Sequence, residues 1–174
     1  MDPAAIVATV DERTDHTATR LVVITGGEPF RQNIRALVYA LLDAGYYVQI
    51  ETNGTLQPAD LPYNLHPDQR RGVYVVCSPK TGKLYPTIYN IACCLKYVVD
   101  FADMDMRDGL PKSALRHTGY PARPPMEWNR PIYVQPMDAK DPEHNRANYE
   151  TAIASCMRFG YTLQVQVHKI VGVD

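Results

Sequence analysis

Glycines and polar side chains directly follow several apolar runs of this sequence, and the first such group is Thr25 to Pro29. Paired glycines let a ligand approach the backbone closely, and a carboxylate can accept hydrogen bonds from an ammonium group. Gly26, Gly27 and Glu28 therefore suit an amino acid head group. The alternative is structural: the glycines turn the chain, and Glu28 with Pro29 opens a helix.

A second group, Glu51 to Thr55, combines a carboxylate with hydroxyl and amide side chains. These groups suit ribose hydroxyls or the polar edge of a substrate. Asn53 and Gly54 also form an ordinary turn sequence. Both interpretations hold if the glycine turns the chain while Glu51 and Thr52 face a ligand.

Two further groups offer contacts for a nucleoside. In Ser78, Pro79 and Lys80, the proline presets the backbone, and the hydroxyl and ammonium groups can contact a carboxylate or a ribose. In Gln135 to Asp138, the polar Gln135 and the apolar Met137 can line an adenine pocket. The alternatives are a solvated loop for the first group and a core position for Met137.

His168 lies six residues before the last residue, Asp174. A lone histidine at the end of a strand usually has a structural hydrogen-bond partner. The closeness of the terminal carboxylate in sequence nevertheless makes His168 a candidate for binding a ligand.

The four cysteines, Cys77, Cys93, Cys94 and Cys156, lie in apolar segments without disulfide or Cys-x-x-Cys spacing. Adjacent cysteines point apart in any regular element, so Cys93 and Cys94 are poor candidates for a shared metal. We expect buried roles for these two and assign no metal ligand.

Short β-branched runs alternate with helical stretches, which is typical of successive βα units around a parallel sheet. Strands are predicted at 21–24, 47–51, 73–76, 95–99, 131–134 and 161–167, and helices at 3–9, 34–42 and 142–159. Gly45 and Gly160 end the last two helices. The apolar stripe of the final helix is Tyr149, Ala152, Ile153, Cys156 and Met157. Ligands of such sheets bind beyond the carboxyl ends of the strands, where the four groups collect.

Length and composition favour one domain over 1–174, since 174 residues with 45% hydrophobic content can build one core. The periodicity fails between 100 and 130. Such a long connection indicates a lid, an interface element or an ordered surface insertion.

The charge balance argues for a small-molecule ligand. Lys and Arg number 18 against 19 Asp and Glu, so no basic field attracts a nucleic acid or an anionic membrane. No apolar run reaches the ~18 residues that cross a bilayer, and the start has no signal-peptide layout. We expect a cytoplasmic protein with no direct contact to nucleic acid or membrane.

Taken in order, these groups resemble the 7-carboxy-7-deazaguanine synthases, which are radical S-adenosylmethionine (SAM) enzymes. Leu95 to Val99 and Asp141 to Tyr149 also match, and the resemblance is weakest across 101–129. The resemblance implies an α/β fold: an incomplete (β/α) barrel of the radical SAM type with a mostly parallel sheet. It further implies a single partial domain that lacks the first βα unit.

The family cleaves SAM reductively at a [4Fe-4S] cluster and, with Mg2+ assisting, converts 6-carboxy-5,6,7,8-tetrahydropterin to 7-carboxy-7-deazaguanine with loss of ammonia. This product serves queuosine and related deazapurine pathways. The resemblance implies that SAM contacts come from Gly26, Gly27, Glu28, Glu51, Ser78, Pro79, Lys80, Gln135, Pro136, Met137 and Asp138. It implies pterin contacts from Thr25, His168 and the terminal carboxylate of Asp174.

The chain departs from the family in its cysteines. Relatives begin with roughly one more βα unit, which carries substrate contacts, a magnesium ligand and a Cys-x-x-x-Cys-x-x-Cys or longer-spaced motif for the cluster. No such motif occurs in these residues. The sequence therefore predicts that this chain alone is inactive and that the strand at 21–24 has an unpaired edge.

Three hypotheses follow from this departure. The chain is a fragment of a longer enzyme, through an internal start, a gene interruption or a truncated gene model. Alternatively, it is one half of a split enzyme, or a cluster-free protein that binds SAM and the pterin. A homodimer or pairing with a missing N-terminal segment is expected.

Overall fold

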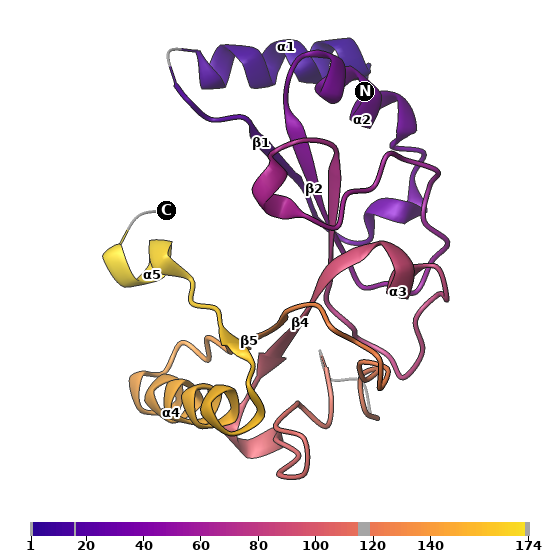
Figure 1. The fold of residues 1–174 in the computed structure, drawn as a ribbon. Coiled ribbons are helices and arrows are strands. Elements are labelled where there is room, and N and C mark those ends of the chain that lie inside the picture. The colour runs from indigo at the N-terminus through magenta and orange to yellow at the C-terminus, as the bar shows by residue number, and fades with distance from the viewer. Residues whose placement is uncertain (1, 16, 115–118, 173–174) are drawn as a thin grey trace. The chain divides into compact units, whose positions relative to one another are not determined.

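The computed structural model describes residues 2–15, 17–114 and 119–172. The chain divides into two compact units. The first comprises Met1–Ser78 and Leu84–Cys93, and the second comprises Pro79–Lys83 and Cys94–Asp174. Each unit combines parallel strands with helices, so the α/β class predicted from the sequence is confirmed (Figure 1).

The first unit contains a parallel sheet in which β2 pairs with both β1 and β3. Its strands are β1 (Leu21–Ile24), β2 (Tyr47–Thr52) and β3 (Val73–Cys77). Its helices are α1 (Pro3–Thr14), α2 (Arg35–Asp43) and the short α3 (Ile88–Ile91), with 3-10 turns at Pro29–Arg31 and Pro67–Gln69. Among the described residues, β1 pairs only with β2, as expected for an edge strand.

Helices α1 and α2 lie side by side in this unit (Figure 1). Val38 and Leu41 of α2 are fully buried and belong to one cluster with Val48 and Ile50 of β2. Since side chains alternate along a strand, the residues between them on β2 face away from this core. Polar residues such as Glu51 can therefore occupy the second face of the sheet.

In the second unit, β5 pairs in parallel with both β4 and β6. Its strands are β4 (Ala92–Val99), β5 (Ile132–Pro136) and β6 (Thr162–Leu163). Its helices are α4 (Pro142–Phe159) and α5 (Val167–Val171), with a 3-10 turn at Phe101–Asp103.

The buried face of α4 differs from the predicted apolar stripe. Asn148, Ala152 and Ser155 are buried, whereas Ile153 is 44% exposed and Met157 is 84% exposed. Of the predicted stripe, only Ala152 is fully buried. The reason is that the inward side chains of α4 bind backbone groups: Asn148 bonds to Phe101 and Met137, and Ser155 donates to the Gly109 carbonyl.

Most other element boundaries agree with the sequence within about two residues. Helix α1 runs on to Thr14 beyond its predicted end at 9, β4 begins at Ala92 before its predicted start at 95, and α3 was not predicted. The largest difference in type of element is at the C-terminal end. The prediction of a strand at 161–167 is wrong beyond Leu163, because β6 pairs with β5 only at Tyr133 and Val134. Helix α5 follows, so His168 lies on a helix and not at a strand end. Gly45 and Gly160 have positive φ, as predicted for residues that end helices.

The connection between β4 and β5 is held within the second unit by polar contacts. The Tyr97 hydroxyl donates to the Ala122 carbonyl at 2.6 Å, and the Arg123 guanidinium pairs with Asp108 at 2.8 Å. An isolated bridge joins Met104 to Pro111. Among the described residues, no helix is long and apolar enough to cross a membrane.

Candidate functional site

The buried carboxylate of Glu28 joins the carboxyl ends of β1 and β2. Its Oε1 accepts hydrogen bonds from the Thr52 hydroxyl at 2.6 Å and from the Phe30 amide at 3.2 Å. Its Oε2 accepts one from the Asn53 amide at 2.8 Å. Glu28 is 8% exposed, so these three donors offset the cost of burying its charge.

The two glycines before Glu28 leave an open stretch of backbone. Gly26 has a φ of 125°, which side chains rarely adopt. A Cβ added at Gly26 or at Gly27 would meet no atom of the described residues within 4 Å. Thr25 and both glycines are exposed, so this turn is accessible to a ligand.

The end of β2 is tightly packed. Gly54 has a φ of 76°, and a Cβ there would lie 2.8 Å from Cys77 Sγ and 2.9 Å from Leu84 Cδ2. The Ser78 amide donates to the Thr52 carbonyl at 2.8 Å. Within this unit, Glu28 therefore joins the turn after β1 to the end of β2. The hydrogen bond from Ser78 joins the end of β2 to the residue that follows β3.

Glu51 lies on the face of β2 opposite to buried Ile50 and Thr52. Its Oε1 accepts a hydrogen bond from Gln49 Nε2 at 3.3 Å. Glu51 is half-buried and therefore stays accessible on that face.

In the second unit, three residues predicted from the sequence line one cavity of about 230 Å3: Pro79, Lys80 and Met137. The cavity lies at the carboxyl end of β4. Its other lining residues are Tyr97, Val98, Asp100, Asp103, Pro111, Ser113 and Ala114.

A neighbouring cavity of about 250 Å3 is lined by Pro136, Met137, Asp138 and Lys169, together with Asn145, Tyr149 and Gln166. The Asp138 carboxylate accepts hydrogen bonds from Lys169 Nζ at 2.5 Å, Lys140 N at 2.9 Å and Asn145 Nδ2 at 3.0 Å. The hydrogen bond from Lys169 is the main reason why the pKa of Asp138 lies well below its ordinary value. Asp138 thus connects the end of β5 to α5.

Two other predicted residues of the second unit, Gln135 and His168, line neither cavity. Gln135 points away from the buried face formed by Val134 and Pro136. His168 is exposed on α5, and Asp174 lies outside the described residues.

Asp100 and Asn148 were not predicted from the sequence as residues of the site. Asp100 directly follows the strand predicted at 95–99, so the rule that selected the other strand ends also selects it. Asn148 is fully buried and bonds to Phe101 N and Met137 O, both at 2.8 Å. No local sequence signal identifies Asn148, because its partners are 47 and 11 residues away.

The cysteines of this chain do not fit an iron–sulfur site. Cys77, Cys93 and Cys94 are buried, as predicted for the last two, and Cys93 Sγ contacts the Val75 carbonyl at 3.1 Å. A [4Fe-4S] cluster is held by Cys thiolates that converge on it. Within the described ranges, no three Cys, His, Asp or Glu side chains are grouped to hold a metal.

No family model matches this chain. A 7-carboxy-7-deazaguanine synthase of Rhodospirillum rubrum is 42% identical to it, over 97% of this chain and 71% of that protein. The chain belongs to the 7-carboxy-7-deazaguanine synthase family. A family member from Rickettsia prowazekii is 35% identical, over 88% of this chain and 59% of its own length.

The crystal structure of QueE from Escherichia coli matches the fold with a TM-score of 0.63 at 23% identity. The match covers 95% of this chain and 64% of QueE. The family and the parallel α/β fold implied by the strand-end groups are therefore confirmed.

Proposed function

We propose that this chain forms the SAM- and pterin-binding part of a 7-carboxy-7-deazaguanine synthase. The complete enzyme would convert 6-carboxy-5,6,7,8-tetrahydropterin to 7-carboxy-7-deazaguanine with loss of ammonia. The observation that carries the proposal is the 42% identity to the Rhodospirillum rubrum synthase across 97% of this chain. A segment that matches a relative over nearly its whole length is expected to bind the same ligands as the corresponding part of that relative.

The proposed SAM contacts include residues of the first unit and residues of the second. The open backbone of Gly26 and Gly27 suits the methionine carboxylate and ammonium groups, because no described residue lies within 4 Å of a Cβ built at either glycine. The cavity lined by Pro79, Lys80 and Met137 suits the nucleoside, since it combines apolar walls with polar rims. Glu51 and Ser78 are the further SAM contacts of this proposal, together with Glu28, Gln135, Pro136 and Asp138.

The pterin would contact Thr25, His168 and Asp174. Thr25 is exposed beside the glycine turn, and His168 is exposed on α5. The neighbouring residue Lys169 is tied to Asp138, which holds α5 against the end of β5. The role of this chain would be to bind and orient both small molecules.

The [4Fe-4S] cluster supplies the electron that cleaves SAM in the complete family. Because the cysteines described above do not fit a cluster, we assign its ligands, and that of Mg2+, to polypeptide beyond these 174 residues. That polypeptide is either more of the same chain or a partner. The alternative is a cluster-free protein that binds SAM and the pterin, which the buried state of three of the four cysteines also allows.

Calorimetry on the purified 174-residue chain tests the binding proposal. We expect heat of binding for SAM and for 6-carboxy-5,6,7,8-tetrahydropterin. No detectable heat for either compound contradicts it.

Iron analysis after co-purification separates the enzyme part from the cluster-free protein. An iron-containing partner or a longer iron-containing product of the same gene supports the enzyme. A stop codon directly upstream of Met1, with no iron-containing partner, supports the cluster-free protein.

A further inference from the structure

We propose that Asp100 recognises the 6-amino group of the adenine of SAM and that His144 is the residue that positions it. This inference rests on the SAM site proposed above. Asp100 follows the last residue of β4 and lines the cavity together with Lys80 and Met137. Neither Asp100 nor His144 was among the residues selected from the sequence.

The walls of the cavity suit a flat apolar group. Pro79, Val98, Pro111 and Met137 contribute aliphatic surface, and the volume is about 230 Å3. Pockets for complete small molecules are usually larger, at roughly 300–1,000 Å3. The cavity therefore fits a part of SAM, and a purine base matches its apolar walls best.

The carboxylate of Asp100 is held by one of its two oxygens. Oδ1 accepts a hydrogen bond from the Ala102 amide at 3.1 Å and contacts His144 Nε2 at 3.0 Å. Within 2–15, 17–114 and 119–172, Oδ2 has no hydrogen-bond partner. The side chain is 25% exposed. A fixed carboxylate with one available oxygen is suited to accept a hydrogen bond from an amino group.

Asp103 provides the second carboxylate of the cavity, and this carboxylate binds groups of its own loop. Its Oδ2 accepts hydrogen bonds from the Ser113 amide at 2.9 Å and from the Ser113 hydroxyl at 2.6 Å. The Asp103 carbonyl accepts another from the Lys112 amide at 2.9 Å. In the part of the chain that the structure describes, both acids therefore keep one carboxylate oxygen available. Asp100 is the better candidate for contact with a ligand because it directly follows Val99, whose carbonyl accepts a hydrogen bond from the Met137 amide at 2.8 Å.

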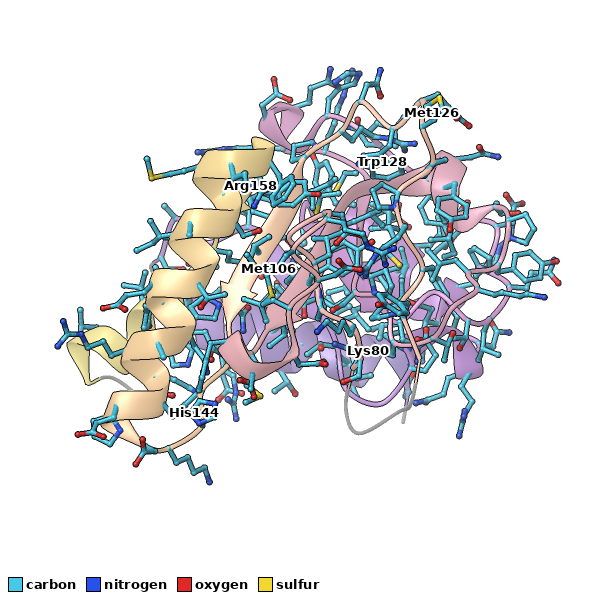
Figure 2. All side chains as sticks on the ribbon, turned by 90° about the horizontal axis from the view of Figure 1, so that it is seen from below. Lys80, Met106, Met126, Trp128, His144 and Arg158 are labelled. Atoms are coloured by element: carbon cyan, nitrogen blue, oxygen red, sulfur yellow. The ribbon has the colours of Figure 1, made fainter. Side chains whose placement is uncertain are left out.

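His144 is well placed to orient Asp100. It lies in the first turn of α4 and packs edge-to-face on Phe101, with ring centroids 4.8 Å apart. Figure 2 shows His144 near one end of α4 and Arg158 near the other. Asn148, one turn further along α4, fixes Phe101 N and Met137 O. The helix therefore sets the position of Asp100 relative to Met137 on the cavity wall.

The chemistry predicts discrimination between adenine and hypoxanthine. Adenine presents an amino donor at position 6, whereas hypoxanthine presents an oxygen acceptor there. Asp100 pairs with the donor and repels the acceptor. A site that hydrogen-bonds a ligand group discriminates strongly against an analogue that lacks it. An asparagine at this position can either accept or donate, so it tolerates both bases.

The test compares the binding of SAM and of its 6-oxo analogue, S-inosylmethionine, by calorimetry on the full chain. We expect the unmodified chain to bind SAM at least about tenfold more tightly than the analogue, as for one hydrogen bond to a charged group. Asp100→Asn should reduce this ratio to within about threefold. His144→Phe should reduce it too, whereas His144→Gln, which keeps a donor, should retain most of it.

Asp43→Asn serves as the control, since Asp43 is an exposed residue of α2 and should leave the ratio unchanged. If SAM binds but Asp100→Asn retains the preference, the assignment of Asp100 is wrong while the SAM site stands. If the unmodified chain binds neither compound, the SAM site and the assignment both fail.

Discussion

At the scale of single residues, two glycines at strand ends differ in what surrounds them. Gly54 has a positive φ and packs against Cys77 and Leu84, whereas Gly27 has free space at the position of a Cβ. A side chain at Gly54 would therefore disturb the protein itself. At Gly27 it would occupy space that we assign to a ligand.

Gly54→Ala should lower the free energy of unfolding by about 2 kcal/mol or more, from a left-handed backbone and overpacking together. Gly27→Ala should change it by less than about 1 kcal/mol and weaken SAM binding. Urea denaturation and calorimetry check the two effects. Equal destabilisation by both substitutions would contradict the difference in packing.

Glu28 shows what a local sequence pattern can reveal about a side chain and what it cannot. The sequence indicated a carboxylate at a strand end and suggested an ammonium group as its partner. In the structure, the carboxylate already accepts hydrogen bonds from Thr52, Asn53 and Phe30. Two of these donors lie more than 20 residues away, so a local motif cannot reveal them.

At the scale of elements, α4 holds the strand ends that line the cavity. Asn148 is its fully buried polar residue, and each end of its amide binds one backbone group. An apolar residue of similar size would leave both backbone groups without these bonds.

Asn148→Ala should cost about 1–3 kcal/mol for each backbone group left unpaired in the interior. It should also increase hydrogen exchange at the Phe101 amide, which loses its acceptor. Urea denaturation and exchange followed by mass spectrometry measure the two effects. Glu150→Ala, at an exposed position of the same helix, should stay within about 0.5 kcal/mol of the unmodified chain.

Helix α5 depends on the Asp138–Lys169 pair. The pKa of Asp138 lies below its ordinary value of 3.8, so the pair contributes stability above about pH 4. That contribution is lost as the pH falls through the lower pKa of the folded state. Hydrogen exchange in α5 should therefore rise on acidification below pH 4.

Asp138→Asn should raise the exchange in α5 already at pH 7 and remove its acid dependence. Asp60→Asn is the control: the Asp60 side chain is 92% exposed in its 3.8 Å pair with Arg35. An acid response of α5 that survives Asp138→Asn would rule out this explanation.

The boundaries of elements were predictable where a strand is paired over its full length. β1 matches its predicted range, because four consecutive pairs to β2 support it. β6 does not, because its length is set by two pairs to β5 and not by its own β-branched residues. Helix α5 begins at Val167, inside the range predicted as a strand. The residue at which such a strand ends is therefore decided by pairing partners that are distant in sequence.

At the scale of the whole molecule, the alternation of strands and helices was enough to predict the parallel α/β class, and the order of strand-end groups was enough to predict the family. The division into two compact units was not predictable. Contacts between residues distant in sequence, such as the hydrogen bond from the Tyr97 hydroxyl to the Ala122 carbonyl within the second unit, do not appear in the periodicity of the sequence.

The edge strand β1 gives a prediction for the behaviour of the chain in solution. Val23 is 44% exposed on this strand, and unpaired strand edges promote association between chains. Val23→Lys should reduce self-association at high protein concentration, measured by sedimentation velocity, with little change in melting temperature. Val171→Lys is the control, since Val171 is 61% exposed on α5 and not on a strand edge. Equal effects of the two substitutions would contradict a role for the edge.

The chain passes from the first unit to the second and back, which limits how it can be divided into separately expressed pieces. Residues 79–83 belong to the second unit, although residues on both sides of them, through 78 and from 84 to 93, belong to the first. Expression of 1–93 and 94–174 as separate pieces would leave Lys80 on one piece and Met137 on the other. Neither piece could then rebuild the nucleoside cavity alone, and recovery of binding on mixing would require the two to reassociate.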